Sequence, residues 1–114
     1  MPYIEAKLST ELSETQKEDL QNKLTQAVSS AFGKPSMYIM TNIETGKSLY
    51  MGANKAENGA YLSISLLGSA TKQACQGLTE NICALLENDF NLNGKNVYIT
   101  YHPTDLWGWN SMMF

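Results

Sequence analysis

Hydrophobic positions along the chain follow two patterns, one typical of strands and the other of helices. Residues 2–8 alternate apolar and polar side chains, which predicts a strand with one buried face. Residues 20–31 instead space their apolar side chains at helical intervals. Ser13 and Gln16 match a capping box at the start of this helix, and Gly33 predicts its end.

A second strand is expected over residues 37–43, directly after the helix. The stretch 44–59 is rich in glycine and asparagine, which favour turns. Within it we expect a short hairpin around residues 49–51.

The same order of elements then starts again. Residues 61–67 predict a strand, Ser69 is a candidate cap for a second helix, and Gly94 is a candidate end for it. Residues 97–101 predict the final strand of this half.

The two halves of the chain also align with each other. At an offset of 60 residues Ile4 falls on Ile64, and the helical stripes align at an offset of 58. We therefore interpret residues 1–114 as one domain with pseudo-repeat halves of about 2–58 and 59–114. Because β-α-β crossovers are right-handed, we expect an α/β (α+β) fold with a four-stranded mixed sheet and two helices on one face.

The two faces of this sheet are expected to differ in character. The face toward the helices would carry aliphatic side chains, namely Ile4, Ala6, Leu8, Ile39, Ile64, Leu66, Val97 and Ile99. The opposite face would carry aromatic and polar ones, namely Tyr3, Glu5, Lys7, Tyr38, Met40, Asn42, Ser63, Ser65, Tyr98, Thr100 and His102. Because this second face suits neither solvent nor a dry core, and both sheet edges lack a partner, we expect a closed homo-oligomer.

Composition narrows the choice of partners. All eight basic residues are lysines, eleven residues are acidic, and the net charge is −3. An acidic chain without arginine is a poor candidate for binding nucleic acid. Charged residues make up only 17% of the chain, which is consistent with a surface partly covered by another subunit.

Neither membrane insertion nor a disulfide is expected. The longest apolar run, residues 82–86, is too short to span a bilayer, and the N-terminal residues lack a signal-peptide core. Cys75 and Cys83 lie eight residues apart on the second expected helix. That spacing is a rise of about 12 Å, so we expect free thiols buried in the core.

Pro2 is a candidate catalytic base. Removal of Met1 would leave a secondary amine, whose pKa would be lowered toward neutrality by burial or by a nearby lysine. A base of that kind works best near neutral pH. If Met1 is retained, the Pro2 nitrogen is an amide and cannot act as a base. In the alternative interpretation Pro2 has no chemical role.

Other candidate residues each have a functional and a structural interpretation. Lys34 would hold a substrate carboxylate, or it would stabilise a helix C-terminus. Tyr98 would donate a hydrogen bond to a carbonyl oxygen, or it would only pack. The aromatic tail, residues 105–114, would form the wall of a flat pocket, or it would pack across a subunit boundary.

No cofactor or metal is expected. His102 is the only histidine and has no further ligand at metal-binding spacing. The chain also lacks a nucleophile elbow, a phosphate loop and a dinucleotide fingerprint.

Four segments share their order and spacing with one known family. They are residues 2–4, 33–39, 97–101 and 107–114. Together they resemble the macrophage migration inhibitory factor family of the tautomerase superfamily. The resemblance implies a homotrimer of doubled β-α-β subunits whose sheets form a central barrel. It also implies a catalytic N-terminal proline in a pocket between subunits.

The resemblance further implies roles for single residues. Pro2 matches the catalytic base and Lys34 the substrate-binding lysine. Leu67 matches a residue whose backbone contacts substrate, and Tyr98 matches the pocket tyrosine of the neighbouring subunit. The remaining pocket positions are Thr100, Trp107, Trp109 and Phe114.

Family members interconvert the keto and enol forms of phenylpyruvate and hydroxyphenylpyruvate and tautomerise dopachrome esters. They also act as cytokine-like ligands of a cell-surface immune receptor. The resemblance therefore implies an aromatic 2-keto acid substrate. It also implies a location in the cytoplasm and, without a signal peptide, outside the cell.

Several positions depart from the family. Thr100 replaces a usual pocket asparagine, and Trp107 replaces a small aliphatic residue, so one substrate hydrogen bond and the shape of the pocket mouth are expected to differ. Gly59 and Leu62 stand where the vertebrate cytokine has a Cys-x-x-Cys motif, so thiol oxidoreductase activity is not implied. Leu12 stands in place of an arginine used in chemokine-receptor mimicry. A chain without arginine is also a poor match to the dehalogenase and oxalocrotonate branches.

Three interpretations remain open at this point. The first is a keto–enol tautomerase that uses Pro2 as its base. The second is a receptor-binding ligand whose pocket is vestigial. The third is a small trimeric domain with neither role.

Overall fold

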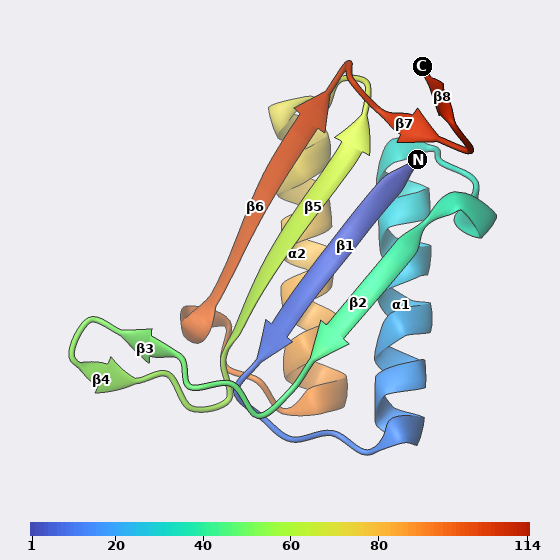
Figure 1. Ribbon diagram of the computed structural model, residues 1–114. Coiled ribbons are helices and arrows are strands. Elements are labelled where there is room, and N and C mark those ends of the chain that lie inside the picture. The colour runs from blue at the N-terminus through green and yellow to red at the C-terminus, as the bar shows by residue number, and fades with distance from the viewer.

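The computed structural model describes residues 1–114 and has two layers, a mixed sheet and a pair of helices (Figure 1). The elements in chain order are β1 (Pro2–Leu8), α1 (Glu14–Phe32), η1 (Ser36–Tyr38), β2 (Met40–Glu44), β3 (Tyr50–Met51), β4 (Asn54–Lys55), β5 (Ala60–Leu67), α2 (Lys72–Phe90), η2 (Gly94–Asn96), β6 (Val97–Thr104), β7 (Gly108–Trp109) and β8 (Met112–Met113).

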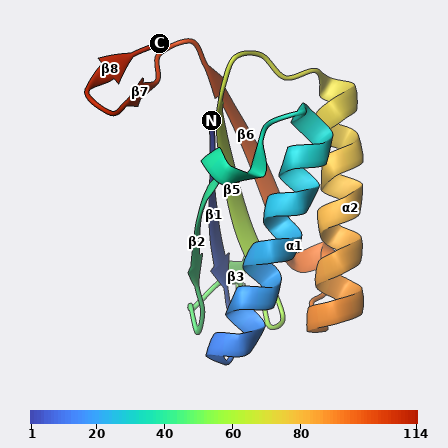
Figure 2. The same cartoon turned by 90° about the vertical axis from the view of Figure 1, so that its right-hand side faces the viewer.

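The principal sheet has four strands in the order β2-β1-β5-β6. β1 and β2 are parallel, as are β5 and β6, while β1 and β5 are antiparallel and join the two β-α-β units. Both helices cover one face of the sheet, and no element of the chain covers most of the other face (Figure 2). The arrangement confirms the expected mixed sheet with two helices on one face.

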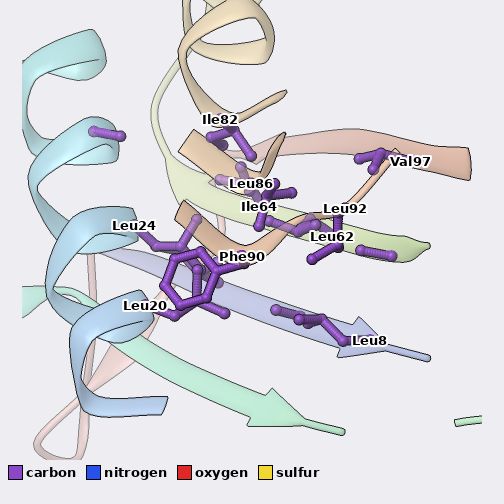
Figure 3. Packing of buried hydrophobic residues seen from close by; sticks show 14 of the residues in the cluster. Leu8, Leu20, Leu24, Leu62, Ile64, Ile82, Leu86, Phe90, Leu92 and Val97 are labelled. Carbon is purple, nitrogen blue, oxygen red and sulfur yellow. The ribbon is translucent and has the colours of Figure 1, made fainter. Parts of the chain in front are cut away.

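The hydrophobic core lies between the sheet and the helices. Along β1 and β5, buried and partly exposed side chains alternate, as the sequence pattern predicts. Ile64 of β5 packs with Ile82 and Leu86 of α2 in this core (Figure 3). Each such aliphatic side chain contributes roughly 1.5–3 kcal/mol on full burial, so this layer fixes the helices against the sheet.

The ends of α1 and the short hairpin agree with the sequence. The Ser13 hydroxyl accepts a hydrogen bond from the Gln16 backbone at 3.2 Å, and the Gln16 side chain accepts one from the Ser13 backbone at 2.9 Å. Gly33 ends the helix in the left-handed conformation, with a φ of 63°. β3 and β4 form the expected hairpin.

The ends of α2 differ from the prediction. The helix is capped by Thr71 instead of Ser69, because the Thr71 hydroxyl accepts a hydrogen bond from the Ala74 backbone at 3.1 Å. Its last residue is Phe90, and Asn91 caps its end instead of Gly94, because asparagine also tolerates the left-handed conformation found at helix ends. Gly94 begins the 3-10 turn η2.

The second strand starts later than predicted. Pro35 and Ser36 carbonyls accept hydrogen bonds from the Tyr38 and Ile39 backbones at 3.2 and 3.1 Å, which forms η1 instead of extended chain. β2 therefore begins at Met40. Placing Tyr38 on the open face of the sheet was consequently wrong.

The last strand is longer than predicted and runs to Thr104. It includes Pro103, which cannot donate to a ladder. The proline is tolerated because β6 is an edge strand.

Cys75 and Cys83 are free thiols, as expected. They are partly exposed, however, so their placement in the fully buried core was wrong. Neither α1 nor α2 combines the length and apolar character that a membrane-spanning helix requires.

Candidate active site

A mostly apolar cavity of about 500 Å³ opens at the end of the sheet where β1 begins. Its lining comes from the start of β1, the segment around η1 and the tail hairpin: Met1, Pro2, Tyr3, Met37, Tyr38, Ile39, Met40, Trp107, Gly108 and Trp109. These three segments meet beside the N-terminus (Figure 1). The volume falls in the range of small-molecule sites.

Pro2 is held at this cavity by the sheet. It is the first residue of β1, is fully buried and pairs with Leu66 of β5. The Leu67 backbone N–H donates to the Met1 carbonyl at 3.3 Å. Because proline has no N–H, it is tolerated at the first position of a strand. The fold thus places the Pro2 ring in the cavity wall.

Lys34 is positioned by the end of α1. Its backbone N–H donates to the Ser29 carbonyl at 3.2 Å, and the Ser29 hydroxyl donates to the Lys34 carbonyl at 2.6 Å. The Lys34 Nζ donates to the Leu67 carbonyl at 3.1 Å. Leu67 therefore connects the lysine to the start of β1, as its N–H bonds Met1. The ammonium is therefore held at Leu67, near enough to the Met1 amine to act on it electrostatically, although Lys34 itself does not line the cavity.

The electrostatics at this end of the chain favour a neutral amine. Burial lowers the pKa of the Met1 amine, and the positive charge of Lys34 lowers it further. Both causes arise from the surroundings of β1 and not from Met1 itself.

The tail hairpin supplies the aromatic wall of the cavity. Asn110 and Ser111 have φ values of 52° and 67°, which form the tight turn between β7 and β8. Trp109 meets Tyr38 edge-to-face with ring centroids 5.9 Å apart. It also stacks on Phe114 at 6.2 Å. Trp107 and Trp109 line the cavity, whereas Phe114 contacts Trp109 but is not part of the lining.

Two of the residues that the sequence nominates lie away from Pro2. Tyr98 pairs with Tyr61, five residues along β5 from the partner of Pro2, which is a strand length of about 17 Å. Its side chain is 62% exposed. The Thr100 hydroxyl lies within hydrogen-bond distance of the Tyr61 hydroxyl, at 2.8 Å, and of His102 Nε2, at 2.9 Å. A single chain thus does not bring Tyr98 or Thr100 to the cavity.

The profile of the family described as macrophage migration inhibitory factor (MIF) matches residues 1–114. The chain belongs to this family. MIF of Xenopus tropicalis is 28% identical to it over 98 residues, which cover 83% of this chain and 84% of the relative.

Solved structures of MIF relatives have the same fold. Leishmania major MIF2 superposes with a TM-score of 0.90 at 21% identity and covers 100% of this chain and 97% of its own. The MIF-like protein of Entamoeba histolytica superposes with a TM-score of 0.88 at 25% identity and covers 99% and 98%. Membership of the MIF family suggests tautomerase and cytokine-like functions.

The structure of this MIF-family chain adds residues that the sequence did not nominate. Met37, Tyr38 and Met40 line the cavity together with Pro2. Their position directly after Lys34 is the signal that could have identified them. We did not use this signal, because we expected residues 37–43 to be a strand. The structure instead has the turn η1 at Ser36–Tyr38, next to the cavity.

Other features of the chain offer weaker candidate sites. A second cavity, of about 440 Å³, lies among the loops that follow β1 and β2. Its lining is mainly polar, and it contains none of the nominated residues. No group of three or more histidine, cysteine, aspartate or glutamate side chains is placed to hold a metal ion.

Proposed function

We propose that this MIF-family protein is a keto–enol tautomerase of the phenylpyruvate and dopachrome type. The general base is the secondary amine of Pro2, which becomes available when Met1 is removed. The observation that carries the proposal is the buried position of Pro2 in the wall of an apolar cavity, with the Lys34 ammonium bonded nearby to the Leu67 carbonyl.

The chemistry follows from the surroundings of the amine. Burial and the Lys34 charge lower the pKa of the Met1 amine, and in our proposal the same two causes lower the pKa of the Pro2 amine and so increase its neutral fraction near pH 7. The neutral nitrogen takes a proton from the carbon beside the substrate carbonyl, which leaves an enolate. Water protonates the enolate oxygen to give the enol, and the protonated Pro2 amine returns its proton to the solvent. The reverse transfers restore the keto form. The reaction moves only protons and therefore needs no cofactor.

The walls of the cavity favour an aromatic 2-keto acid as substrate. The aryl group fits between the segment that carries Met37 and Met40 and the aromatic wall of Trp107 and Trp109. The substrate carboxylate binds Lys34 by a charge-assisted hydrogen bond, and the Leu67 carbonyl, which accepts from Lys34 Nζ, holds the ammonium in place.

The active form is a homotrimer in which a neighbouring subunit contributes Tyr98 and Thr100 to each site. This proposal is supported by the open face of the sheet, which carries both residues away from the Pro2 of their own chain. The edge strands β2 and β6 also have no partner within the chain.

A Pro2→Gly variant tests the role of the amine. We expect intact mass spectrometry of the wild-type protein to show the loss of Met1. We expect kcat for enol-phenylpyruvate to fall by about 10²–10⁴-fold in the variant, the usual share of a general base. Pro103→Ala, on the edge strand β6, serves as the control and keeps its activity. Equal rates for wild type and Pro2→Gly would remove Pro2 from the mechanism.

A second candidate function is that of a cytokine-like ligand for a cell-surface immune receptor. Leu106, Met112 and Met113 favour it, because these large apolar side chains of the tail are exposed. In this function the protein acts outside the cell after release from the cytoplasm without a signal peptide. Binding to immune cells that persists in Pro2→Gly, but is lost when Leu106 is changed to Ser, would support it. Loss of binding in Pro2→Gly alone would place the function in the cavity.

A further inference from the structure

Methionine side chains are concentrated at the end of the molecule that holds the cavity. Met37 and Met40 line it and are 80% and 69% exposed. Met112 and Met113, on the tail strand β8, are each 63% exposed but do not line it. Methionine is among the residue types most often buried, so this exposure is unusual for a soluble domain.

We propose that Met37 and Met40 are a modification site, at which a peroxide oxidises the thioethers to sulfoxides and thereby weakens binding of an apolar substrate. The oxidation is independent of the proposed tautomerase function. Its effect on substrate binding rests on that function.

The oxidation balances with hydrogen peroxide as the only co-reactant. A lone pair of the methionine sulfur attacks one peroxide oxygen, the O–O bond breaks, and that oxygen becomes bound to sulfur. The second oxygen leaves and is protonated to water. Sulfur loses two electrons and the peroxide gains them. Exposure decides which thioethers react. Met37 and Met40, which form the rim of the cavity, are the two most exposed methionines of the chain.

The consequence for binding follows from the polarity of the sulfoxide. A methionine side chain is flexible and apolar, and it adapts to an aromatic ligand. A sulfoxide has a strong dipole that prefers water, and a bound aryl group would cover it without offering a hydrogen bond. A cavity that admits an aromatic substrate also admits a molecule as small as hydrogen peroxide, so the thioethers that line it are reached by the oxidant.

The cysteines are poor competitors for the oxidant. Burial raises the pKa of the Cys75 thiol, and burial together with the charge of Glu87 raises that of Cys83. Thiols oxidise through their thiolates, which are therefore scarce at neutral pH. Both cysteines also lie on α2 and line no part of the cavity.

The test compares wild type, a Met37→Leu/Met40→Leu double variant and a Met112→Leu/Met113→Leu double variant, before and after hydrogen peroxide. Each protein is compared with its own untreated form. Peptide mass mapping locates the added oxygen atoms, and enol-phenylpyruvate kinetics measure the effect.

We expect oxidation to raise the KM of the wild type about tenfold with little change in kcat, as for loss of apolar binding. The KM of the Met112/Met113 variant should rise on oxidation as much as that of the wild type. The KM of the Met37/Met40 variant should not change on oxidation. Methionine sulfoxide reductase with dithiothreitol should restore the KM, whereas dithiothreitol alone should not.

Three results would overturn the proposal. The first is oxidation of Met112 and Met113 under conditions that leave Met37 and Met40 intact. The second is an unchanged KM when both rim residues carry oxygen. The third is equal sensitivity of the Met37/Met40 variant, which would place the damage at a tryptophan or at Pro2.

Failure of the tautomerase function would show itself separately, as an untreated protein without activity. In that case the affinity for the fluorescent probe 1-anilinonaphthalene-8-sulfonate replaces KM as the readout. Its apolar rings suit the cavity walls and its sulfonate suits Lys34. We expect its Kd to rise on oxidation in the wild type and to stay constant in the Met37/Met40 variant, and an unchanged wild-type Kd would contradict the proposal.

Discussion

Lys34 shows how one side chain sets the electrostatics of the cavity. Its ammonium is held by the Leu67 carbonyl at 3.1 Å and does not swing freely at the end of α1. From there its charge opposes protonation of an amine at the start of β1. In the proposed mechanism the same charge binds the substrate carboxylate, so a single residue would serve both binding and the acid–base chemistry.

Changing Lys34 to Gln should therefore shift the pH dependence. The neutral amine is the active form, so kcat/KM rises with pH through the pKa of Pro2. Without the lysine one of the two causes that lower an amine pKa at this end of the chain is removed, so we expect the pKa of Pro2 to rise while the effect of burial remains, and the rising limb to move to higher pH. We also expect KM to increase about tenfold from the lost charge-assisted hydrogen bond.

A pH–rate profile of kcat/KM over roughly pH 5 to 9 measures this shift, since the range extends to both sides of the ordinary amine pKa. Lys47→Gln is the matched control, because Lys47 pairs with Glu44 away from the cavity. A rising limb at the same pH in Lys34→Gln and wild type would show that the lysine does not influence the base.

At the scale of elements, short-range hydrogen bonds decide where the helices start and stop. α1 is opened by the reciprocal bonds of Ser13 and Gln16, and α2 by the Thr71 hydroxyl. These helix ends position the site indirectly, because Lys34 directly follows Gly33, the residue that caps the end of α1.

Ser13→Ala should destabilise the protein by about 1 kcal/mol, because the first turn of α1 loses its side-chain acceptor. Urea unfolding measures the change. Ser13→Asp retains a capping carboxylate and should stay near the wild-type stability. If both variants lost the same stability, the cap would not be the cause.

The tail hairpin is an element that acts on the site through one ring. Phe114 stacks on Trp109, which lines the cavity. Phe114→Ala should raise KM severalfold and leave kcat nearly unchanged, because an aromatic pair contributes roughly 0.5–1.5 kcal/mol. Steady-state kinetics check this, with the neighbouring Met113→Ala as control. A loss confined to kcat would instead give the tail a role in the chemical step.

At the scale of the whole molecule, the open face of the sheet is the feature that one chain cannot account for. It carries Tyr98 and Thr100, while Pro2 lies at the other end of the neighbouring strands. A pocket assembled from two chains would reconcile these positions, and closure around an axis would protect the edges of the sheet.

Sedimentation should therefore report about 38 kDa, three copies of the 12.6 kDa chain. A mixing experiment tests whether sites are shared. Pro2→Gly and Tyr98→Ala should each be weakly active alone. Refolded together at equal amounts, they should regain activity in about a quarter of the sites, those with an intact residue from each chain. No recovery in mixed trimers would contradict the shared pocket.

The sequence by itself determined the four strands of the principal sheet, the two helices and most of the side chains that face the core, but not η1 or the tail hairpin. It did so because periodicity and capping are local properties, as β1 and the Ser13 box show. It also nominated Pro2, Lys34 and the tryptophans of the cavity, through their resemblance to a family pattern.

Tertiary structure alone decided how these residues meet. Leu67 bonds both Lys34 and Met1, and the turn at η1 brings Tyr38 to Trp109. The sheet also keeps Tyr98 away from Pro2. Each of these relations involves positions far apart in the chain. Local patterns contain no record of such contacts. They arise only when two β-α-β units pack into one sheet, because pairing between β1 and β5 fixes where each strand end lies.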